Sequence, residues 1–211
     1  MRGVFITLEG GDGSGKSTQA EKLEEWLTAA GRTVVRTREP GGTDFGNEVR
    51  EIVLHSRGHI SPRAEALLYA ADRAQHIATK VRPALERGDV VVQDRYLDSS
   101  VAYQGAGRVL DADEVRQLSL WAAEGLLPDI TILLDLDEDV ARARLDSANK
   151  RFDRLEAEKS DFHRRVRQAY LDLAERESQR FLVVDAALPP DEIAAIVRGR
   201  VEAFVAASET P

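Results

Sequence analysis

The sequence predicts an α/β fold in which helices flank a parallel β-sheet. The first observation is a set of five short runs rich in β-branched and apolar residues, at positions 4–8, 33–36, 90–93, 130–134 and 181–184. Such near-continuous apolar runs are typical of strands that are covered on both faces. The second observation is that longer helical stretches separate these runs. Alternation of strand and helix indicates parallel strands joined by right-handed crossovers.

Capping residues place the ends of two helices. One helix is predicted over residues 17–30 and is closed by Gly31, and a second is predicted over residues 62–87 and is closed by Gly88. Glycine suits the left-handed conformation that commonly ends a helix. Pro83 lies in the last turns of the second helix. Because proline removes a backbone donor, we expect a kink there.

The remaining organisation is that of one domain. Asp111 followed by Glu114 resembles a capping box and predicts a third helix that runs to about Glu124. Between residues 146 and 159 charge crowds and periodic apolar residues become rare, which predicts a mobile lid segment. The 211 residues contain no internal repeat and no long linker, so residues 1–211 are expected to form a single domain.

Composition excludes several classes of protein. Asp and Glu number 37 against 29 Lys and Arg, so we expect no general affinity for nucleic acid polymers, and a local basic cluster must hold any anionic ligand. The absence of cysteine excludes disulfides, thiolate nucleophiles and zinc–thiolate sites. The first strand begins almost at Met1, and no apolar run approaches the roughly 18 residues of a membrane span. We therefore expect a cytoplasmic protein without a signal peptide.

A phosphate-binding loop follows the first predicted strand. Gly10, four further residues and then Gly15-Lys16-Ser17 satisfy the G-x-x-x-x-G-K-[ST] pattern between a strand and a helix. Inward-facing backbone N–H groups and the helix N-terminus bind a polyanion there. Lys16 is expected to reach the β- and γ-phosphates, and Ser17 to ligate Mg²⁺. The candidate residues are Gly10, Gly11, Asp12, Gly13, Ser14, Gly15, Lys16, Ser17 and Thr18.

Polar groups at later strand ends predict the acceptor side of the site. Asp94 and Arg95 end the third strand, at the edge of a parallel sheet where ligands of open α/β folds bind. Asp94 is suited to hold the metal through water, and Arg95 to bind a phosphate. Residues 99–105 are dense in hydroxyl and amide groups that can contact a base or sugar, and the charged loop 38–43 follows the second strand.

Tyr69 and Arg73 lie four residues apart on the second helix and therefore share a face. They can form an aromatic platform and a cationic donor for one flat ligand. The alternative is a helix that buries Tyr69 in the core and leaves Arg73 in solvent. Their spacing does not favour either interpretation.

Taken together, these motifs resemble those of bacterial thymidylate kinases. The resemblance covers nearly the whole chain, through the phosphate loop, residues 38–43, 69–73, 94–96 with 99–105, and Asp153-Arg154-Leu155-Glu156. It implies that ATP phosphorylates dTMP to dTDP with Mg²⁺, for DNA precursor synthesis. It also implies the three-layer P-loop kinase fold, with five parallel strands in the order 2-3-1-4-5, and a homodimer.

The resemblance further implies roles for individual residues on the dTMP side. The thymine would stack on Tyr69, where the family usually has phenylalanine, and Arg73 would donate to a thymine carbonyl. Tyr103 would lie against the sugar and disfavour a 2′-hydroxyl, and Asp12 would hold the 3′-hydroxyl. The other positions implied around the base, sugar and 5′-phosphate are Glu39, Arg50, Arg95, Ser99, Ser100 and Gln104.

The catalytic cation is expected from the lid segment. One branch of the family supplies an arginine at the position that is Gly13 here, and this chain lacks it. Arg154 is the best replacement, as in the branch with an arginine-bearing lid, and it joins Lys16, Asp12 and Arg95 as a candidate catalytic residue. Weaker candidates, because charge runs are usually solvated helix faces, are Arg142, Arg144, Lys150 and Arg151.

Two other functions are compatible with a phosphate loop. A deoxynucleoside kinase also pairs such a loop with an acidic residue and arginine at a strand end, but its acceptor has no 5′-phosphate. The expected clamp of Arg50 and Arg95 argues against it. A non-catalytic P-loop switch would bind ATP without needing Tyr69, Arg73 and Gln104 to converge on a crevice.

Overall fold

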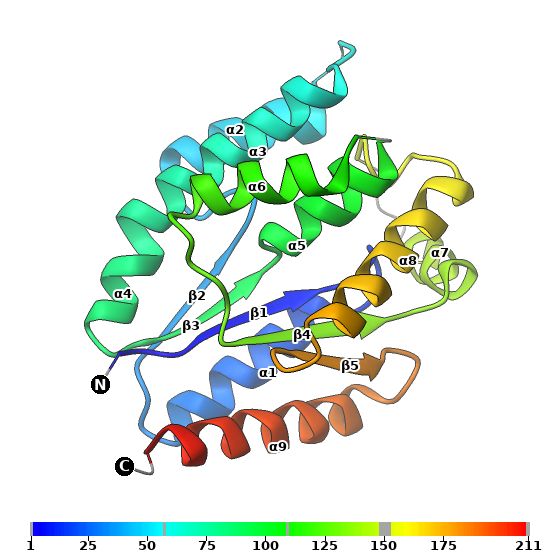
Figure 1. The fold of residues 1–211 in the computed structure, drawn as a ribbon. Coiled ribbons are helices and arrows are strands. Elements are labelled where there is room, and N and C mark those ends of the chain that lie inside the picture. The colour runs from blue at the N-terminus through cyan, green and yellow to red at the C-terminus, as the bar shows by residue number, and fades with distance from the viewer. Residues whose placement is uncertain (1, 57, 109, 148–152, 210–211) are drawn as a thin grey trace.

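A five-stranded parallel sheet lies at the centre of the computed structural model, which describes residues 2–56, 58–108, 110–147 and 153–209 (Figure 1). The strands are β1 (Phe5–Glu9), β2 (Val34–Arg38), β3 (Val90–Asp94), β4 (Ile130–Asp135) and β5 (Phe181–Asp185). Neighbouring strands pair in parallel in the order β2-β3-β1-β4-β5. The expected parallel sheet and its strand order are therefore confirmed.

Helices cover both faces of this sheet. One face packs against α1 (Lys16–Ala29) and α9 (Pro190–Glu209) (Figure 1). The other helices are α2 (Asp44–His55), α3 (Pro62–His76), α4 (Arg82–Glu86), α5 (Leu97–Ser100), α6 (Ala112–Ala122), α7 (Glu138–Ser147) and α8 (Ser160–Arg176). Of these, α3 to α6 and α8 lie over the opposite face, where apolar side chains of β1, β3 and β4 pack under them. In the described part of the chain, no helix is long and apolar enough to cross a membrane.

The second predicted helix is interrupted before Pro83. It consists of α3, a π-helical turn over Ile77–Val81, and α4. Proline has no N–H to give to the carbonyl four residues earlier, so the hydrogen-bond register of the helix changes ahead of it. The third predicted helix, α6, begins as expected: Asp111 Oδ1 accepts from the Glu114 N–H at 3.0 Å. It ends at Ala122, two residues before the predicted end.

Strand register brings three charged residues to one edge of the sheet. Leu8 pairs with Asp94 in β3 and with Ile132 in β4, and Arg38 of β2 also pairs with Asp94. Glu9, Arg38 and Asp94 therefore end their strands side by side. This carboxyl edge is where the phosphate loop leaves β1 and where open α/β sheets bind ligands.

Candidate active site

A cavity of about 530 Å³ opens at the carboxyl edge of the sheet. Most of the residues predicted for the site line it: Asp12, Gly13, Gly15, Lys16, Ser17, Thr18, Glu39, Arg50, Tyr69, Arg73, Asp94, Arg95, Ser99, Ser100, Tyr103 and Gln104. The other predicted site residues, Gly10, Gly11, Ser14 and Arg154, are not among its lining. Gly10 and Gly11 line a neighbouring cavity of about 240 Å³ instead.

The phosphate loop is shaped by glycines in backbone conformations that other residues rarely adopt. Gly10, Gly13 and Gly15 have φ values of 132°, 79° and 91°. Lys16, the first residue of α1, donates from Nζ to the carbonyls of Gly10 at 3.1 Å and Gly11 at 2.7 Å. Burial, helped by repulsion from Arg95, lowers the pKa of Lys16 to about 8. A polyanion in the loop would reverse this effect, so the loop is suited to phosphate.

Ser17 and Asp94 form a site suited to a hydrated magnesium ion. The Ser17 hydroxyl donates to Asp94 Oδ2 at 3.3 Å. The other oxygen of this carboxylate, Oδ1, is buried and has no hydrogen-bond partner among the described residues. The described residues contain no cluster of three or more His, Cys, Asp or Glu side chains that could enclose a metal. Magnesium does not need such a cluster, because it usually keeps several waters and binds substrate phosphates.

Arg95 is the centre of the hydrogen-bond network in the cavity. Its Nη2 donates to Asp12 Oδ1 at 2.6 Å and to the Tyr103 hydroxyl at 3.1 Å. Its Nη1 donates to Ser99 Oγ at 3.2 Å and to the Tyr170 hydroxyl at 3.3 Å. Burial alone would raise the pKa of Asp12, but Arg95 and then Lys16 outweigh it and lower that pKa to about 2. Asp12 is therefore ionised and holds Arg95 against the phosphate loop.

Glu9 is connected to Arg95 through the hydroxyl groups of Ser99 and Tyr170. The carboxylate ends β1 and is fully buried. It accepts from the Tyr96 N–H at 2.7 Å, Ser99 Oγ at 2.6 Å and the Tyr170 hydroxyl at 2.9 Å. Since the hydroxyls of Ser99 and Tyr170 donate to Glu9, their lone pairs face Arg95. Burial, with repulsion from Asp98, raises the pKa of Glu9 to about 7.

Three arginines make one wall of the cavity basic. Arg38, Arg50 and Arg95 all line it, and Arg50 Nη1 donates to the carbonyl of Pro40 at 3.0 Å. Burial lowers the pKa of Arg50, and repulsion from Arg38 and Arg95 adds to this effect. Guanidinium groups that repel one another in a partly buried wall favour a bound anion.

The opposite end of the cavity has the character of a base site. Tyr69 and Arg73 of α3 both line it, and their side chains are buried, with Arg73 only 1% exposed. The arrangement that leaves Arg73 in solvent is therefore wrong. Arg73 donates from Nε to Glu39, from Nη1 to Ser119 and from Nη2 to Ser100. A guanidinium has five N–H groups, so two remain without a hydrogen bond to the described residues.

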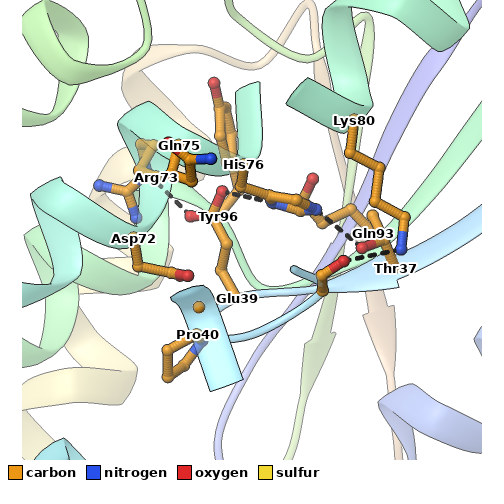
Figure 2. Close-up of polar contacts among 12 residues, drawn as sticks. Thr37, Glu39, Pro40, Asp72, Arg73, Gln75, His76, Lys80, Gln93 and Tyr96 are labelled. Carbon is orange, nitrogen blue, oxygen red and sulfur yellow. Dashed lines mark hydrogen bonds and ion pairs between the residues drawn. The ribbon is translucent and has the colours of Figure 1, made fainter. Parts of the chain in front are cut away.

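Glu39 lies in the cavity wall with each carboxylate oxygen already bonded (Figure 2). Oε2 accepts from Arg73 Nε at 2.9 Å, and Oε1 lies 3.0 Å from His76 Nδ1. The resemblance implies that Glu39 lies near the sugar and 5′-phosphate. In the structure its carboxylate is bonded to Arg73 and His76 of α3, and its contact with the sugar or the phosphate stays a prediction.

Glu65 joins the base site to the predicted catalytic arginine. Its Oε1 accepts from Gln104 Nε2 at 2.9 Å, and its Oε2 forms an ion pair with the Nη2 group of Arg154. Arg154 Nε also donates to the carbonyl of Val53 at 2.8 Å. Arg154 therefore lies behind the cavity wall and not beside the phosphate loop. Its catalytic role stays a prediction.

The lid segment expected over residues 146–159 is described only in part. Lys150 and Arg151 lie outside the described residues, as does the rest of 148–152. Residues 153–156 form a compact turn, in which Asp153 Oδ1 accepts from the Glu156 N–H at 2.9 Å and Leu155 is buried. This part of the segment is packed into the domain.

Helix α7 approaches the phosphate loop at Gly13. A Cβ at this position would lie 3.0 Å from the carbonyl oxygen of Ala141 and 3.2 Å from Leu145 Cγ. A side chain at this position would therefore require α7 to shift by a few tenths of an ångström. Arg144 of the same helix lines the cavity, and its Nη2 donates to the carbonyl of Ala186 at 3.0 Å.

Sequence reasoning missed Glu9 and Tyr170 as site residues, and it named Arg38 only as part of the charged loop 38–43. Glu9 and Arg38 had a usable signal, because each is a charged residue at the end of a predicted apolar strand, beside a loop already assigned to the site. Tyr170 had none, because it lies in α8, which was not predicted, and it reaches Glu9 across a sequence separation of 161 residues.

Comparison with known proteins assigns the chain to a family. The family model for thymidylate kinase matches residues 8–197. The chain is 76% identical over 203 residues to a thymidylate kinase of Leifsonia xyli, covering 96% of each protein, and 72% identical over 207 residues to one of Clavibacter sepedonicus, covering 98% of each. It matches a crystal structure of thymidylate kinase from Ehrlichia chaffeensis with a TM-score of 0.78 and 30% identity, over 95% of this chain and 99% of that chain. The chain belongs to the thymidylate kinase family.

Proposed function

We infer that the protein phosphorylates dTMP to dTDP with ATP as the donor, which is the reaction of its family. The observation that carries this inference is the continuous cavity at the sheet edge. It is lined by residues of the phosphate loop, by the buried pair Tyr69 and Arg73, and by the arginines Arg38, Arg50 and Arg95. The cavity thus offers separate sites for a triphosphate, a monophosphate and a flat base.

The triphosphate of ATP would occupy the loop that begins at Gly10. Its backbone N–H groups and Lys16 would bind the phosphates, taking Lys16 from the loop carbonyls that it contacts. Ser17 directly, and Asp94 through a water on its free Oδ1, would hold Mg²⁺. When bound, the ion supplies charge neutralisation at the β- and γ-phosphates.

The base of dTMP would lie on Tyr69 beside Arg73. The two unbonded N–H groups of Arg73 would donate to a carbonyl of the thymine, and Ser100 and Gln104 would contact the base edge. A guanidinium donor in a buried site discriminates strongly against a ligand that cannot accept its hydrogen bond. This would distinguish a pyrimidine with a 4-carbonyl group from one with a 4-amino group.

The sugar and phosphate of dTMP would lie between the base site and the loop. Arg50 and Arg95, with Arg38 beside them, would bind the 5′-phosphate. Tyr103 would pack against the sugar, and Asp12 would hold its 3′-hydroxyl. Because Asp12 and Tyr103 both bond to Arg95, one network would orient the sugar and the attacking phosphate together.

Transfer requires alignment of the two phosphates and neutralisation of the charge that spreads over the moving group. Lys16 and Arg95, which both line the cavity, would flank that group. We propose that a third cation comes from the lid segment, with Arg154 as the first candidate. Arg144 is the alternative, because it already lines the cavity.

We also propose that the chain works as a single domain with a lid over residues 146–159, and that it forms homodimers. On α3 and α6, two large apolar side chains are exposed: Leu67 at 57% and Trp121 at 79%. A shallow cavity of about 250 Å³ lies between the two helices, lined in part by Ala66, Leu67 and Leu118. A second copy of the chain could bury this face.

The experiment that tests this function is an ADP-release assay with ATP and Mg²⁺. The acceptors would be dTMP, dUMP, UMP, CMP, GMP, AMP and thymidine. We expect strong turnover with dTMP, weaker turnover with dUMP and little with the others. Phosphorylation of thymidine but not dTMP would indicate a deoxynucleoside kinase, and ATP binding without turnover of any acceptor would indicate a non-catalytic switch.

A further inference from the structure

We propose that His76 is a positioning residue that sets the selectivity of the base site by fixing the direction in which Arg73 presents its free N–H groups. This inference rests on the proposed contact between Arg73 and the thymine. His76 does not line the cavity, so it would act through Glu39.

A chain of four side chains connects β2 to the base site (Figure 2). Thr37 Oγ1 lies 2.7 Å from His76 Nε2, and His76 Nδ1 lies 3.0 Å from Glu39 Oε1. The second oxygen of Glu39 accepts from Arg73 Nε at 2.9 Å. His76 thus bonds to one carboxylate oxygen of Glu39, and the other oxygen of Glu39 bonds to Arg73.

The hydrogen bonds also determine which ring nitrogen carries the proton. The Glu39 carboxylate pairs with buried Arg73, and an ionised carboxylate can only accept. His76 Nδ1 must therefore be the donor to Glu39. In a neutral ring Nε2 then accepts from the Thr37 hydroxyl, whereas a doubly protonated ring would donate to it. Loss of this hydroxyl would remove the contact that favours the Nδ1–H form.

Burial makes these contacts expensive to break. His76 is fully buried, and Glu39 and Arg73 are 3% and 1% exposed. The backbone closes over the bond between Thr37 and His76: a Cβ on Gly42 would lie 2.5 Å from Thr37 Oγ1 and 2.7 Å from His76 Nε2. Water has little room to replace a lost partner, and an unpaired buried polar group is strongly unfavourable.

The charged neighbours Asp72 and Lys80 do not hydrogen-bond to Glu39 among the described contacts, although burial and then repulsion from Glu39 raise the pKa of Asp72 to about 7. Asp72 accepts from the Gly41 N–H, at 3.3 Å to each oxygen, and Lys80 donates to the Gly42 carbonyl at 2.8 Å. His76 is therefore the group that holds Glu39 Oε1 among the described residues. Without it the carboxylate can rotate, and Arg73 loses the fixed partner of its Nε group, while Ser119 and Ser100 still hold Nη1 and Nη2.

The experiment compares ligands that differ at position 4 of the pyrimidine. 5-Methyl-dCMP has the methyl group of dTMP but carries a 4-amino group and lacks the N3–H, whereas dUMP keeps the 4-carbonyl and lacks the methyl group. For each enzyme, kcat/KM for dTMP and dUMP would be measured, and 5-methyl-dCMP would be tested as substrate and as competitive inhibitor. The variants are His76→Leu, Thr37→Val and the conservative Thr37→Ser, each checked by circular dichroism and thermal melting.

We expect the preference for dTMP over 5-methyl-dCMP to fall about tenfold in His76→Leu and about threefold in Thr37→Val, with Thr37→Ser close to wild type. The preference for dTMP over dUMP should change much less, because the methyl group does not contact Arg73 N–H groups. A role limited to stability would lower the melting temperature and leave both preferences unchanged.

A preference for dTMP over 5-methyl-dCMP that stays within about twofold of wild type in every folded variant would overturn the proposal. If His76→Leu does not fold, Thr37→Val still tests the proposal, because valine keeps the shape of threonine and removes only its hydroxyl group. Arg73→Lys separates this result from failure of the proposed function. If that variant also keeps the wild-type preference, Arg73 does not contact position 4, and the base-site assignment itself is wrong.

Discussion

The guanidinium of Arg154 forms an ion pair with the buried carboxylate of Glu65. Glu65 is fully buried in α3, and its other oxygen accepts from Gln104 in the base site. The arginine predicted to act in catalysis is thus bonded to Glu65, which also holds the cavity residue Gln104. To contact a transferred phosphoryl group it must leave Glu65, which closure of the lid over both nucleotides could bring about.

Replacement of Arg154 by alanine tests this catalytic role. If Arg154 neutralises the transition state, Arg154→Ala should lower kcat by about a thousandfold, because an arginine acting on a transferred phosphoryl group contributes on that scale. KM for dTMP should change only a few-fold, since the interaction would form mainly in the transition state. Steady-state and single-turnover kinetics would separate the two effects.

Arg144→Ala is the matched control for the same assay. Arg144 lines the cavity already, and it is bonded only to a backbone carbonyl among the described contacts. If kcat of Arg154→Ala survives within a few-fold while its melting temperature falls, Arg154 stabilises Glu65 and does not act in catalysis. A large loss of kcat in Arg144→Ala would then identify the cation on α7.

Glu9→Gln should weaken dTMP binding without affecting ATP. The amide must keep its oxygen toward the Tyr96 N–H, so its NH₂ group faces the hydroxyls of Ser99 and Tyr170. Those hydroxyls then accept from the amide, and their hydrogens are free to turn toward Arg95. We expect KM for dTMP to rise about tenfold, with KM for ATP nearly unchanged.

The pH dependence of the same variant provides a second readout. The pKa of Glu9 is raised to about 7, mainly by burial, so the carboxylate that orders Ser99 and Tyr170 is lost as pH falls below 7. In the wild type, kcat/KM for dTMP should therefore decrease as pH falls through about 7. Glu9→Gln should lack this ionisation, while those of the dTMP phosphate and of Lys16, whose pKa is about 8, remain. Identical pH profiles for the two enzymes would contradict this role of Glu9.

The sheet could be predicted because its signal is local. Each buried strand is a short apolar run, and the strand order followed from the resemblance of the motifs to one family. Helices α7 and α8 were not predicted, because they carry many charged residues and few apolar ones. Helix α8 nevertheless has an apolar face with helical spacing, because Phe162, Val166 and Tyr170 recur every four residues and pack on the same side. Tertiary packing determines such helices more than local sequence does.

The site could be predicted where a strand end or a motif identifies a residue. Asp94 and Arg95 are of this kind, and both line the cavity. The partners of these residues could not be predicted in the same way. The contact of Glu39 with His76 depends on the packing of α3 against the loop after β2, and the contact of Arg154 with Glu65 spans 89 residues of sequence. Neither is encoded in a local pattern.

Gly13→Ala should lower the free energy of unfolding by more than the cost of placing alanine at a left-handed φ value. Both Gly13 and Gly31 have left-handed φ values, 79° and 78°. A Cβ at Gly31 meets no heavy atom within 4 Å in the described structure, whereas at Gly13 it meets Ala141 and Leu145 of α7. Each alanine should cost about 1–2 kcal/mol for its backbone conformation. Gly13→Ala should cost about 1 kcal/mol more, because α7 must move.

Urea unfolding of the two variants measures this difference. The same displacement of α7 should raise KM for ATP in Gly13→Ala, while Gly31→Ala, at the far end of α1, keeps the wild-type value. Equal unfolding free energies and equal KM values for ATP in both variants would show that α7 does not pack on the phosphate loop in solution.

The exposed face of α3 and α6 should determine the oligomeric state. Trp121 on α6 and Leu67 on α3 are exposed at 79% and 57%, which is unusual for large apolar side chains unless another surface covers them. Trp121→Glu would place a charge in such an interface. Light scattering after size-exclusion chromatography should then show the mass falling from twice the chain mass of 23.3 kDa to the chain mass. Ile196→Glu on α9, which lies across the sheet, should leave the dimer intact. A monomeric wild type would show that this face is not the interface of a dimer. The same conclusion would follow if the Trp121→Glu and Leu67→Glu proteins both stayed dimeric.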